Sequence, residues 1–231
     1  MYKVLDDENN KYYTSAAIDD GVNKVTVSAY ISERKSGLSC WAVYDNNESS
    51  GRIPKEIIRK TAIETRYNLI KEISEADLPE SEWAKSVLDM HRQLEEITPK
   101  GNDGSIITKV PFVIQGNREI EIEFCFEYGS DTPDFIMTDY EPLANAYDIL
   151  ELAEMIVNLE GIERTMEKDK KELQNMYDNQ IAMIEKIPAD KRTLAQKELL
   201  AHYSDLHKDL YGVRPHGDKN RCKANRDYER E

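Results

Sequence analysis

The chain has 231 residues, of which 39% are hydrophobic and 33% charged, and its 45 acidic and 31 basic residues give a formal net charge of −14. A chain of this length holds one good-sized domain, or one domain with an appendage. The charge repels nucleic acid and anionic membranes and attracts cationic surfaces, an effect that salt weakens. We therefore expect an acidic body that does not bind nucleic acid directly.

The cysteines and the hydropathy pattern indicate a cytoplasmic protein. Cys40, Cys125 and Cys222 are widely spaced and form no CxxC motif. That pattern fits a reducing compartment and argues against a disulfide scaffold. The first ten residues contain no apolar core of a signal peptide, and no window is long and apolar enough to span a membrane. We expect no membrane partner.

The first half of the chain predicts a hairpin followed by two helices. Residues 25–31 and 38–44 are rich in β-forming side chains and flank a polar turn, which indicates a β-hairpin. A helix is predicted from Pro54 to about Ser74, because apolar positions recur there at helical spacing: Ile58, Ala62, Thr65, Leu69 and Ile73. A second helix after Pro79 carries its own apolar stripe: Trp83, Val87, Met90 and Leu94.

Acidic and large apolar residues alternate strictly from Arg118 to Glu127. A β-strand turns successive side chains to opposite faces, so one face carries a row of carboxylates roughly 6–7 Å apart. These are Glu119, Glu121, Glu123 and Glu127, with Cys125 as the gap. The row is either a surface that binds a basic groove on a partner protein or the water-facing side of an antiparallel sheet. The alternation alone leaves both open.

This strand pairs with residues 106–115 in a second predicted hairpin, and its register follows from burial. A two-residue loop, Gly116-Asn117, sets Phe112 beside Glu121, whereas a three-residue loop from Gly116 to Arg118 sets it beside Ile122. A slip of one residue moves every side chain to the other face, so burial favours the second register. Pro111 lacks a ladder donor and predicts an edge strand.

Residues 129–142 form a predicted loop in which four carboxylates could bind a hard cation such as Mg²⁺: Asp131, Asp134, Asp139 and Glu141. A metal-dependent hydrolase or nuclease is therefore one alternative function. The spacing matches no EF-hand, however, and the chain contains no phosphate-binding glycine loop, nucleophile motif or zinc pattern. We predict no catalytic residue, no metal and no cofactor.

From residue 143 to about Ile187 the sequence is helical, and it becomes strongly charged after Leu159, where Gly161 weakens the helix. Thr193 and Gln196 match a capping box that begins a last helix, which ends near Gly212. The predicted fold class is α+β: two β-hairpins packed with helices in residues 1–159, and an antiparallel helical hairpin arm in residues 160–211. Residues 212–231 form a basic, flexible tail.

The segment from His202 to Gly217 resembles a C-terminal pattern, YSDxxKDxYGxRPxG, of small uncharacterised proteins from bacteriophages and mobile elements. The matching residues are Tyr203, Ser204, Asp205, Lys208, Asp209, Tyr211, Gly212, Arg214, Pro215 and Gly217. The resemblance covers about 15 residues and implies a phage or mobile-element origin, and therefore action in the bacterial host cytosol. It implies no particular activity.

Together these observations predict a non-enzymatic protein that binds and inhibits a nucleic-acid-handling defence complex of the host, of the anti-CRISPR or anti-restriction type. In this hypothesis the glutamates 119, 121, 123 and 127 occupy a basic groove that otherwise holds nucleic acid. A dimeric scaffolding protein is the second alternative, because residues 160–211 are also a candidate homodimer contact.

Overall fold

The computed structural model describes residues 1–5, 10–45, 53–100, 106–127, 130 and 132–211. It divides into two compact units, Met1–Arg164 and Thr165–Glu231. This boundary lies five residues beyond the predicted end of the body at residue 159. Within the described ranges, no helix combines the length and the apolar content that a membrane crossing requires. The fold is α+β, as the sequence predicts.

The first antiparallel sheet extends the predicted hairpin by two strands. Its strands, in spatial order, are β1 (Lys3–Val4), β2 (Asn10–Asp19), β3 (Lys24–Arg34) and β4 (Gly37–Tyr44). The inner face buries alternate side chains of β3: Val25, Val27, Ala29 and Ile31. The outer face carries three aromatic rings side by side, with centroids 5.1 Å apart for Tyr13 and Tyr30 and 4.7 Å apart for Tyr30 and Trp41. Cross-strand aromatic pairs of this kind stabilise a sheet.

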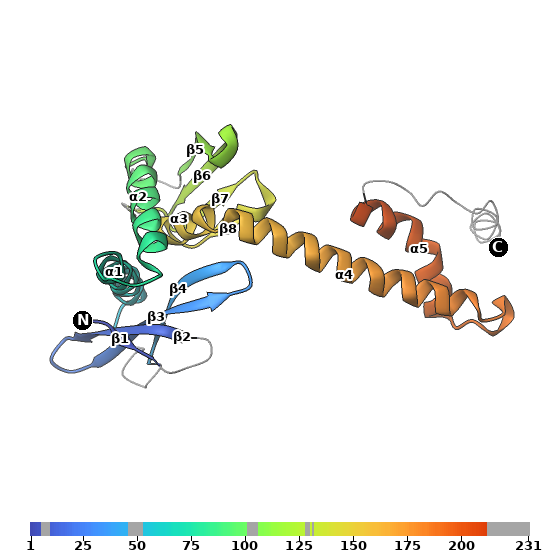
Figure 1. The fold of residues 1–231 in the computed structure, drawn as a ribbon, viewed down its shortest axis with the longest axis horizontal. Helices are drawn as coiled ribbons and strands as arrows, with labels where there is room; N and C mark the ends of the chain where they lie inside the picture. The colour runs from blue at the N-terminus through green and yellow to red at the C-terminus, as the bar shows by residue number, and fades with distance from the viewer. Residues whose placement is uncertain (6–9, 46–52, 101–105, 128–129, 131, 212–231) are drawn as a thin grey trace. The chain divides into compact units, whose positions relative to one another are not determined.

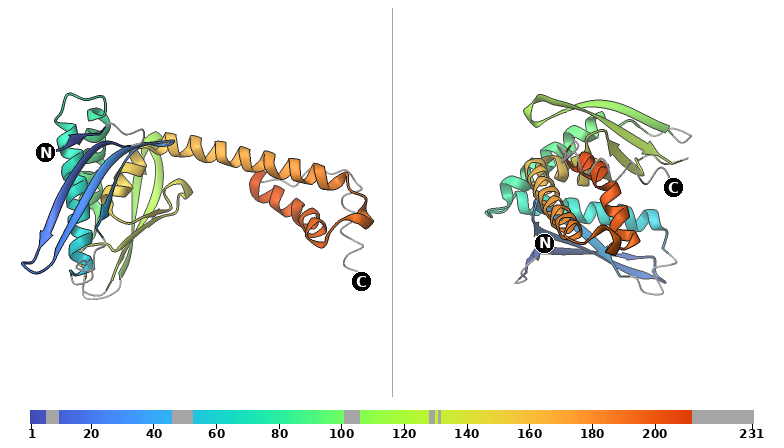
Figure 2. Two further views of the ribbon diagram at one scale, coloured as in Figure 1. Left: turned by 90° about the horizontal axis from the view of Figure 1, so that it is seen from below. Right: turned by 90° about the vertical axis from the view of Figure 1, so that its right-hand side faces the viewer.

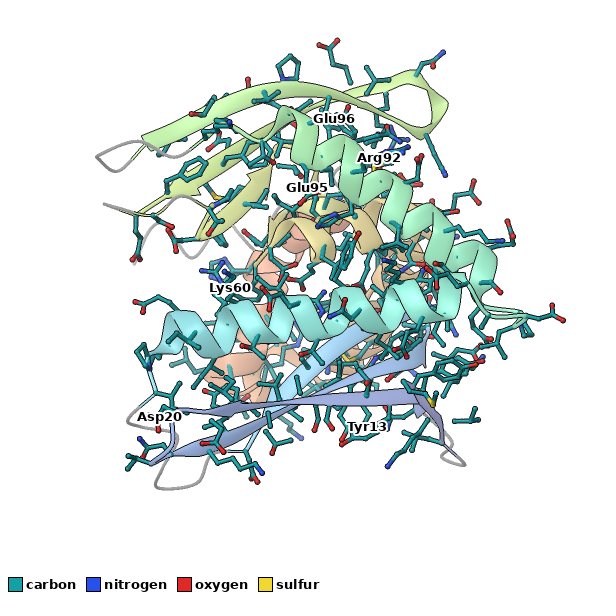
Figure 3. All side chains as sticks on the ribbon, turned by 90° about the vertical axis from the view of Figure 1, so that its left-hand side faces the viewer. Tyr13, Asp20, Lys60, Arg92, Glu95 and Glu96 are labelled. Carbon is teal, nitrogen blue, oxygen red and sulfur yellow. The ribbon has the colours of Figure 1, made fainter. Side chains whose placement is uncertain are left out.

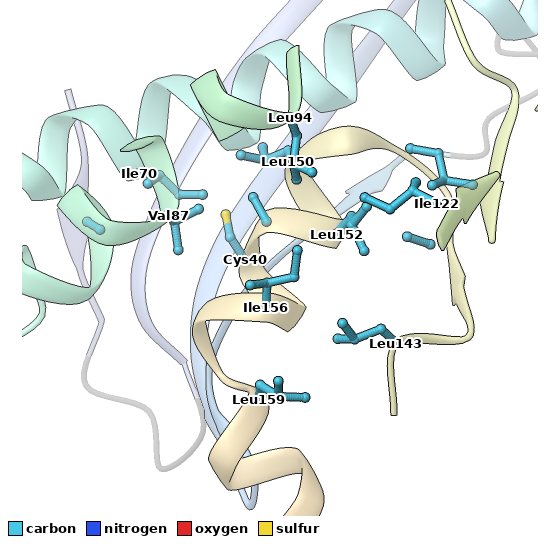
Figure 4. Close-up of a cluster of buried hydrophobic side chains, with 14 of the residues drawn as sticks. Cys40, Ile70, Val87, Leu94, Ile122, Leu143, Leu150, Leu152, Ile156 and Leu159 are labelled. Carbon is cyan, nitrogen blue, oxygen red and sulfur yellow. The ribbon is translucent and has the colours of Figure 1, made fainter. Parts of the chain in front are cut away.

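Three helices lie between this sheet and the second one: α1 (Lys55–Ser74), α2 (Ser81–Ile97) and α3 (Ile149–Val157) (Figures 1 and 3). One continuous hydrophobic cluster joins the helices to the inner faces of both sheets (Figure 4). Ile31 from β3, Leu69 from α1 and Leu150 from α3 are fully buried in it, as are Ile122 and Phe124 from the second sheet. Among the described residues, α1, α2 and α3 therefore all lie on the inner side of each sheet.

The second sheet contains the predicted second hairpin. Its antiparallel strands, in spatial order, are β5 (Ile106–Ile114), β6 (Arg118–Phe126), β7 (Phe135–Thr138) and β8 (Asn145–Ala146). The expected faces are confirmed, because Ile120, Ile122, Phe124 and Phe126 are all buried. The predicted loop position is wrong. The loop is Gln115–Asn117, so Phe112 pairs with Ile120 and not with Ile122.

Two further predictions about this sheet have opposite outcomes. The strand that contains Pro111 lies at the sheet edge, as predicted, because within the described residues β5 pairs with β6 alone. The prediction that residues 129–142 form a loop is wrong for residues 135–138, which make β7. Those four residues pair with β6 on one side and β8 on the other, and Ile136 contributes a fully buried side chain to the core.

The turn between β3 and β4 packs closely against the helix that follows α3. The predicted continuous helix is interrupted at Asn158, and α4 (Leu159–Glu185) begins directly after it. A Cβ atom on Gly161 would overlap the backbone oxygen of Ser36, and one on Gly37 would lie 2.5 Å from the Asn158 Oδ1 atom. Gly161 therefore has a packing role: its missing side chain makes room for the turn.

The second unit contains the rest of α4, a short 3₁₀ turn (Ala189–Lys191) and α5 (Leu194–Tyr211), which turns back along the chain as Figure 2 shows. The capping box is confirmed: the Thr193 amide donates to Gln196 Oε1 at 2.9 Å, and the Gln196 amide donates to Thr193 Oγ1 at 3.3 Å. Ile181 and Ile184 are the buried apolar residues of α4 in this unit. The predicted tail, residues 212–231, lies outside the described residues.

Candidate functional site

The three glutamates within strand β6 share the outer face of the second sheet. Glu119 is exposed and Glu121 and Glu123 are half-buried, while the opposite face of the strand packs into the core. Glu127 is exposed but follows the end of the strand, so it does not continue the ladder. We define the acidic face as Glu119, Glu121 and Glu123 together with the neighbouring Lys109.

Lys109 of β5 partly neutralises this row. Its ammonium lies 2.9 Å from Glu121 Oε1 and 2.5 Å from Glu123 Oε1, because β5 pairs Lys109 directly opposite Glu123. Hydrogen bonds donated to Glu123 and Glu121 raise the pKa of Lys109 above its usual value. Three carboxylates and one ammonium leave a local charge of about −2. The contact was not foreseen, since it depends on the register of two strands.

Apolar side chains flank the carboxylates on the same outer face. On the β5 side, Val113 is 59% exposed and stands opposite Glu119, and Ile107 is 64% exposed opposite Cys125. On the β7 side, Met137 stands opposite Glu123 and is half-buried. The carboxylate row thus has apolar side chains on both of its flanks.

Two of the acidic loop residues flank strand β7 and accept hydrogen bonds from backbone amides in and just after β6. Asp134 accepts a hydrogen bond from the Glu127 amide at 2.7 Å, and Asp139 accepts one from the Glu121 amide at 2.9 Å. These two aspartates flank β7 at opposite ends, so their backbones are roughly 16 Å apart. Glu141 lies beyond Asp139, and Asp131 falls outside the described residues.

The described loop residues are therefore not brought together as a metal site. Across the ranges that the structure describes, no group of three histidine, cysteine, aspartate or glutamate side chains could hold a metal ion. The alternative of a metal-dependent hydrolase or nuclease gains no support from this geometry.

A buried ionic cluster lies at the free edge of β4, and the sequence analysis missed it. Arg66 of α1 donates to Cys40 O, Asp148 Oδ2 and Glu154 Oε1 at 2.8, 2.8 and 2.9 Å. Glu154 also accepts the Cys40 amide at 2.8 Å, and Asn158 donates to Leu38 O at 2.6 Å. The cluster thus satisfies backbone groups on the side of β4 that faces away from β3, where no further strand pairs within the described residues.

The electrostatics of this cluster fit a structural role. Burial raises the pKa of Glu154 to about 7, although the Arg66 guanidinium opposes that shift. Burial alone would lower the pKa of Arg66, but the Asp148 and Glu154 carboxylates raise it above its usual value. Burial also raises the pKa of the Cys40 thiol well above its usual value, so this thiol is a poor nucleophile.

A cavity of about 370 Å³ opens beside the cluster, between the β4 edge and one side of α3. Its wall includes Ala42 and Trp41 from the strand and Glu151 and Met155 from the helix. Both carboxylate oxygens of Glu154 accept hydrogen bonds in the cluster. All three guanidinium nitrogens of Arg66 donate hydrogen bonds there. The cluster therefore holds together the parts of the body around the cavity.

One sequence signal could have revealed this cluster. Arg66 stands within the apolar stripe of α1, four residues after Ala62 and three before Leu69, and Glu154 interrupts the apolar run of α3. Opposite charges inside two apolar helix faces are expected to pair, because an unpaired buried charge is costly.

Comparisons with known proteins add no relative. A scan against protein-family models finds no match, and searches of the curated proteins and of the solved structures find none either. The resemblance of the segment 202–217 to phage and mobile-element proteins thus stays a prediction from the sequence.

Proposed function

We propose that this protein is a non-enzymatic binding protein that inhibits a nucleic-acid-handling defence complex of a bacterial host. In this proposal the acidic face binds a groove lined by lysine and arginine on the partner and excludes nucleic acid from it. One observation carries the proposal: the row of carboxylates lies on the outer face of its sheet, while the helices pack against the opposite face (Figure 3).

Electrostatics favour a partner of this kind over other classes. The formal net charge of −14 speeds the approach of a basic protein and opposes the approach of nucleic acid. The exposed Val113 and Ile107 supply apolar contact area next to the charges. Attraction between solvent-exposed charges is screened by salt, so the complex is expected to weaken as the ionic strength rises.

Reversing charge on the acidic face tests the proposal. Glu119→Lys combined with Glu123→Lys places two cations in the row and should weaken binding at least about tenfold, because both attractions become repulsions. The measurement is quantitative mass spectrometry of basic, nucleic-acid-handling proteins that co-purify from a bacterial lysate at about 50 mM and about 500 mM salt. The recovered partner is then assayed, purified, for loss of nucleic-acid binding in the presence of each variant.

The matched control is Glu64→Lys with Glu96→Lys. Both residues are exposed on helices, outside the acidic face, and this pair changes the net charge from −14 to −10 just as the first pair does. The control variant should co-purify with the same partner as the wild type does. Equal loss in both variants would mean that total charge, and not this face, governs binding. Equal retention, or a partner that binds nucleic acid normally in the complex, would refute the proposed mechanism.

A further inference from the structure

Helix α4 carries a stripe of exposed apolar residues besides the residues that are buried in the second unit. The buried residues there are Ile181 and Ile184, which are 2% and 8% exposed. The exposed residues are Met166, Leu173, Met176 and Met183, with exposed fractions of 37%, 40%, 47% and 61%. At roughly 100° per residue, Met176 and Met183 lie about a quarter turn around the helix from Ile184, whereas Met166 and Leu173 lie on the same side as Ile184 but nearer the N-terminal end of α4.

The spacing of this exposed stripe is that of a coiled-coil seam. Met166 and Leu173 are seven residues apart, as are Met176 and Met183, and Leu173 precedes Met176 by three. These are the a and d positions of a heptad repeat, which stay aligned on one side when two helices supercoil. The remaining seam positions are Asp169 (d) and Gln180 (a).

We propose that this seam, defined by Met166, Leu173, Met176 and Met183, binds the same seam of a second copy of the chain in an antiparallel coiled coil. The pattern is self-complementary under a twofold axis between residues 174 and 175. Met166 then faces Met183 of the second copy, and Leu173 faces its Met176. Such an isologous contact uses the same patch on both subunits.

Charge selects the antiparallel orientation. A parallel pair in register would set Asp169 against Asp169 of the second copy inside the seam, where like charges are costly. The antiparallel pair sets Asp169 against Gln180, whose amide can donate to a carboxylate. Methionine side chains are flexible, so they fill the irregular space between two such helices.

The size of the seam sets the expected strength. From Met166 to Met183 the helix rises roughly 26 Å, or about five turns. A contact of that length is small for a permanent dimer, so we expect a dissociation constant on the order of micromolar. Formation of this dimer does not require the acidic face.

Sedimentation equilibrium of the full chain between about 1 and 200 µM tests the dimer. The wild-type mass should rise with concentration from 26.7 kDa toward twice that value. Leu173→Glu with Met176→Glu places four carboxylates around the twofold axis and should keep the mass at that of the monomer. Asn175→Glu with Ala182→Glu adds the same charge at exposed positions outside the seam and should leave the dimer unchanged.

Disulfide trapping tests the orientation, in chains whose Cys125 and Cys222 are replaced by serine. Mixing a tagged Met166→Cys chain with an untagged Met183→Cys chain should give the mixed disulfide, and neither chain alone should cross-link. Rapid cross-linking of Met166→Cys with itself would show a parallel pair and overturn the proposed register. A wild-type mass that stays monomeric, or a dimer that survives the Leu173 and Met176 changes, would overturn the seam itself.

Discussion

Replacement of Arg66 by methionine is expected to lower the free energy of unfolding by about 3–5 kcal/mol. The side chains of Arg66, Asp148 and Glu154 are 10%, 12% and 6% exposed, so little solvent screens the two carboxyl groups. Both would remain in the interior with no cation beside them, and the Cys40 carbonyl would lose its donor. Removing one partner of a buried ion pair costs far more than the pair contributes.

Chemical denaturation followed by circular dichroism measures this loss. Arg92→Met is the control, because Arg92 is a largely exposed arginine that pairs with Asp89 of its own helix, and it should change stability by about 0.5 kcal/mol or less. Adding Glu154→Gln to Arg66→Met should recover part of the loss, since a neutral amide replaces a buried carboxyl group that has lost its cation. If Arg66→Met and Arg92→Met cost the same, the buried cluster does not stabilise the body as described.

Replacement of Gly161 by alanine is expected to destabilise the protein by about 1–3 kcal/mol. In an ordinary helix interior the same change stabilises by about 1 kcal/mol, because alanine is the better helix former. Here the new Cβ would meet the backbone oxygen of Ser36, which cannot move aside as a flexible side chain would. The sign of the effect therefore distinguishes close packing from simple helix propensity.

The unfolding transition of Gly161→Ala is compared with that of Glu160→Ala. Glu160 is the neighbouring residue on α4 and is exposed, so its replacement should change stability by about 0.5 kcal/mol or less. A Gly161→Ala protein more stable than the wild type would show that the turn at Ser36 does not approach the helix as closely as the structure has it.

Periodicity was sufficient to predict the faces of β6 but not the position of its hairpin loop. Burial of Ile120, Ile122 and Phe124 requires only that apolar residues share one side of the strand. A loop at residues 116–118 and the observed loop at Gln115–Asn117 both satisfy this requirement. The choice between them depends on the turn, where Gly116 and Asn117 both adopt positive φ angles within Gln115–Asn117. The alternation along β6 therefore determines which of its side chains are buried, whereas the turn geometry determines which residue of β5 pairs with each of them.

Short strands escaped prediction where polar residues terminate them. Strand β7 has four residues between Asp134 and Asp139, and those aspartates accept hydrogen bonds from the amides of Glu127, just after β6, and of Glu121 within it. In the sequence the same aspartates and the nearby prolines resemble an irregular loop. The pairing of Arg66 with Glu154 was missed for a related reason, because the two residues are 88 positions apart and only the folded chain brings them together.

The glutamates of β6 lie on one face of the strand, as the sequence predicts, and Lys109 lies beside them. The lysine makes the hypothesis sharper, because a cation inside the row opposes the attraction of a basic partner. The acidic face can now be strengthened as well as weakened by substitution.

The affinity of Lys109→Gln for the basic partner is the most direct test of the acidic face. The change frees Glu121 and Glu123 from their ammonium, so binding should tighten about two- to tenfold at low salt, and the gain should vanish at high salt. Lys60→Gln, at an exposed position on α1, changes the net charge equally and should leave the affinity unchanged. Unchanged or weaker binding by Lys109→Gln would contradict the claim that these carboxylates contact the partner.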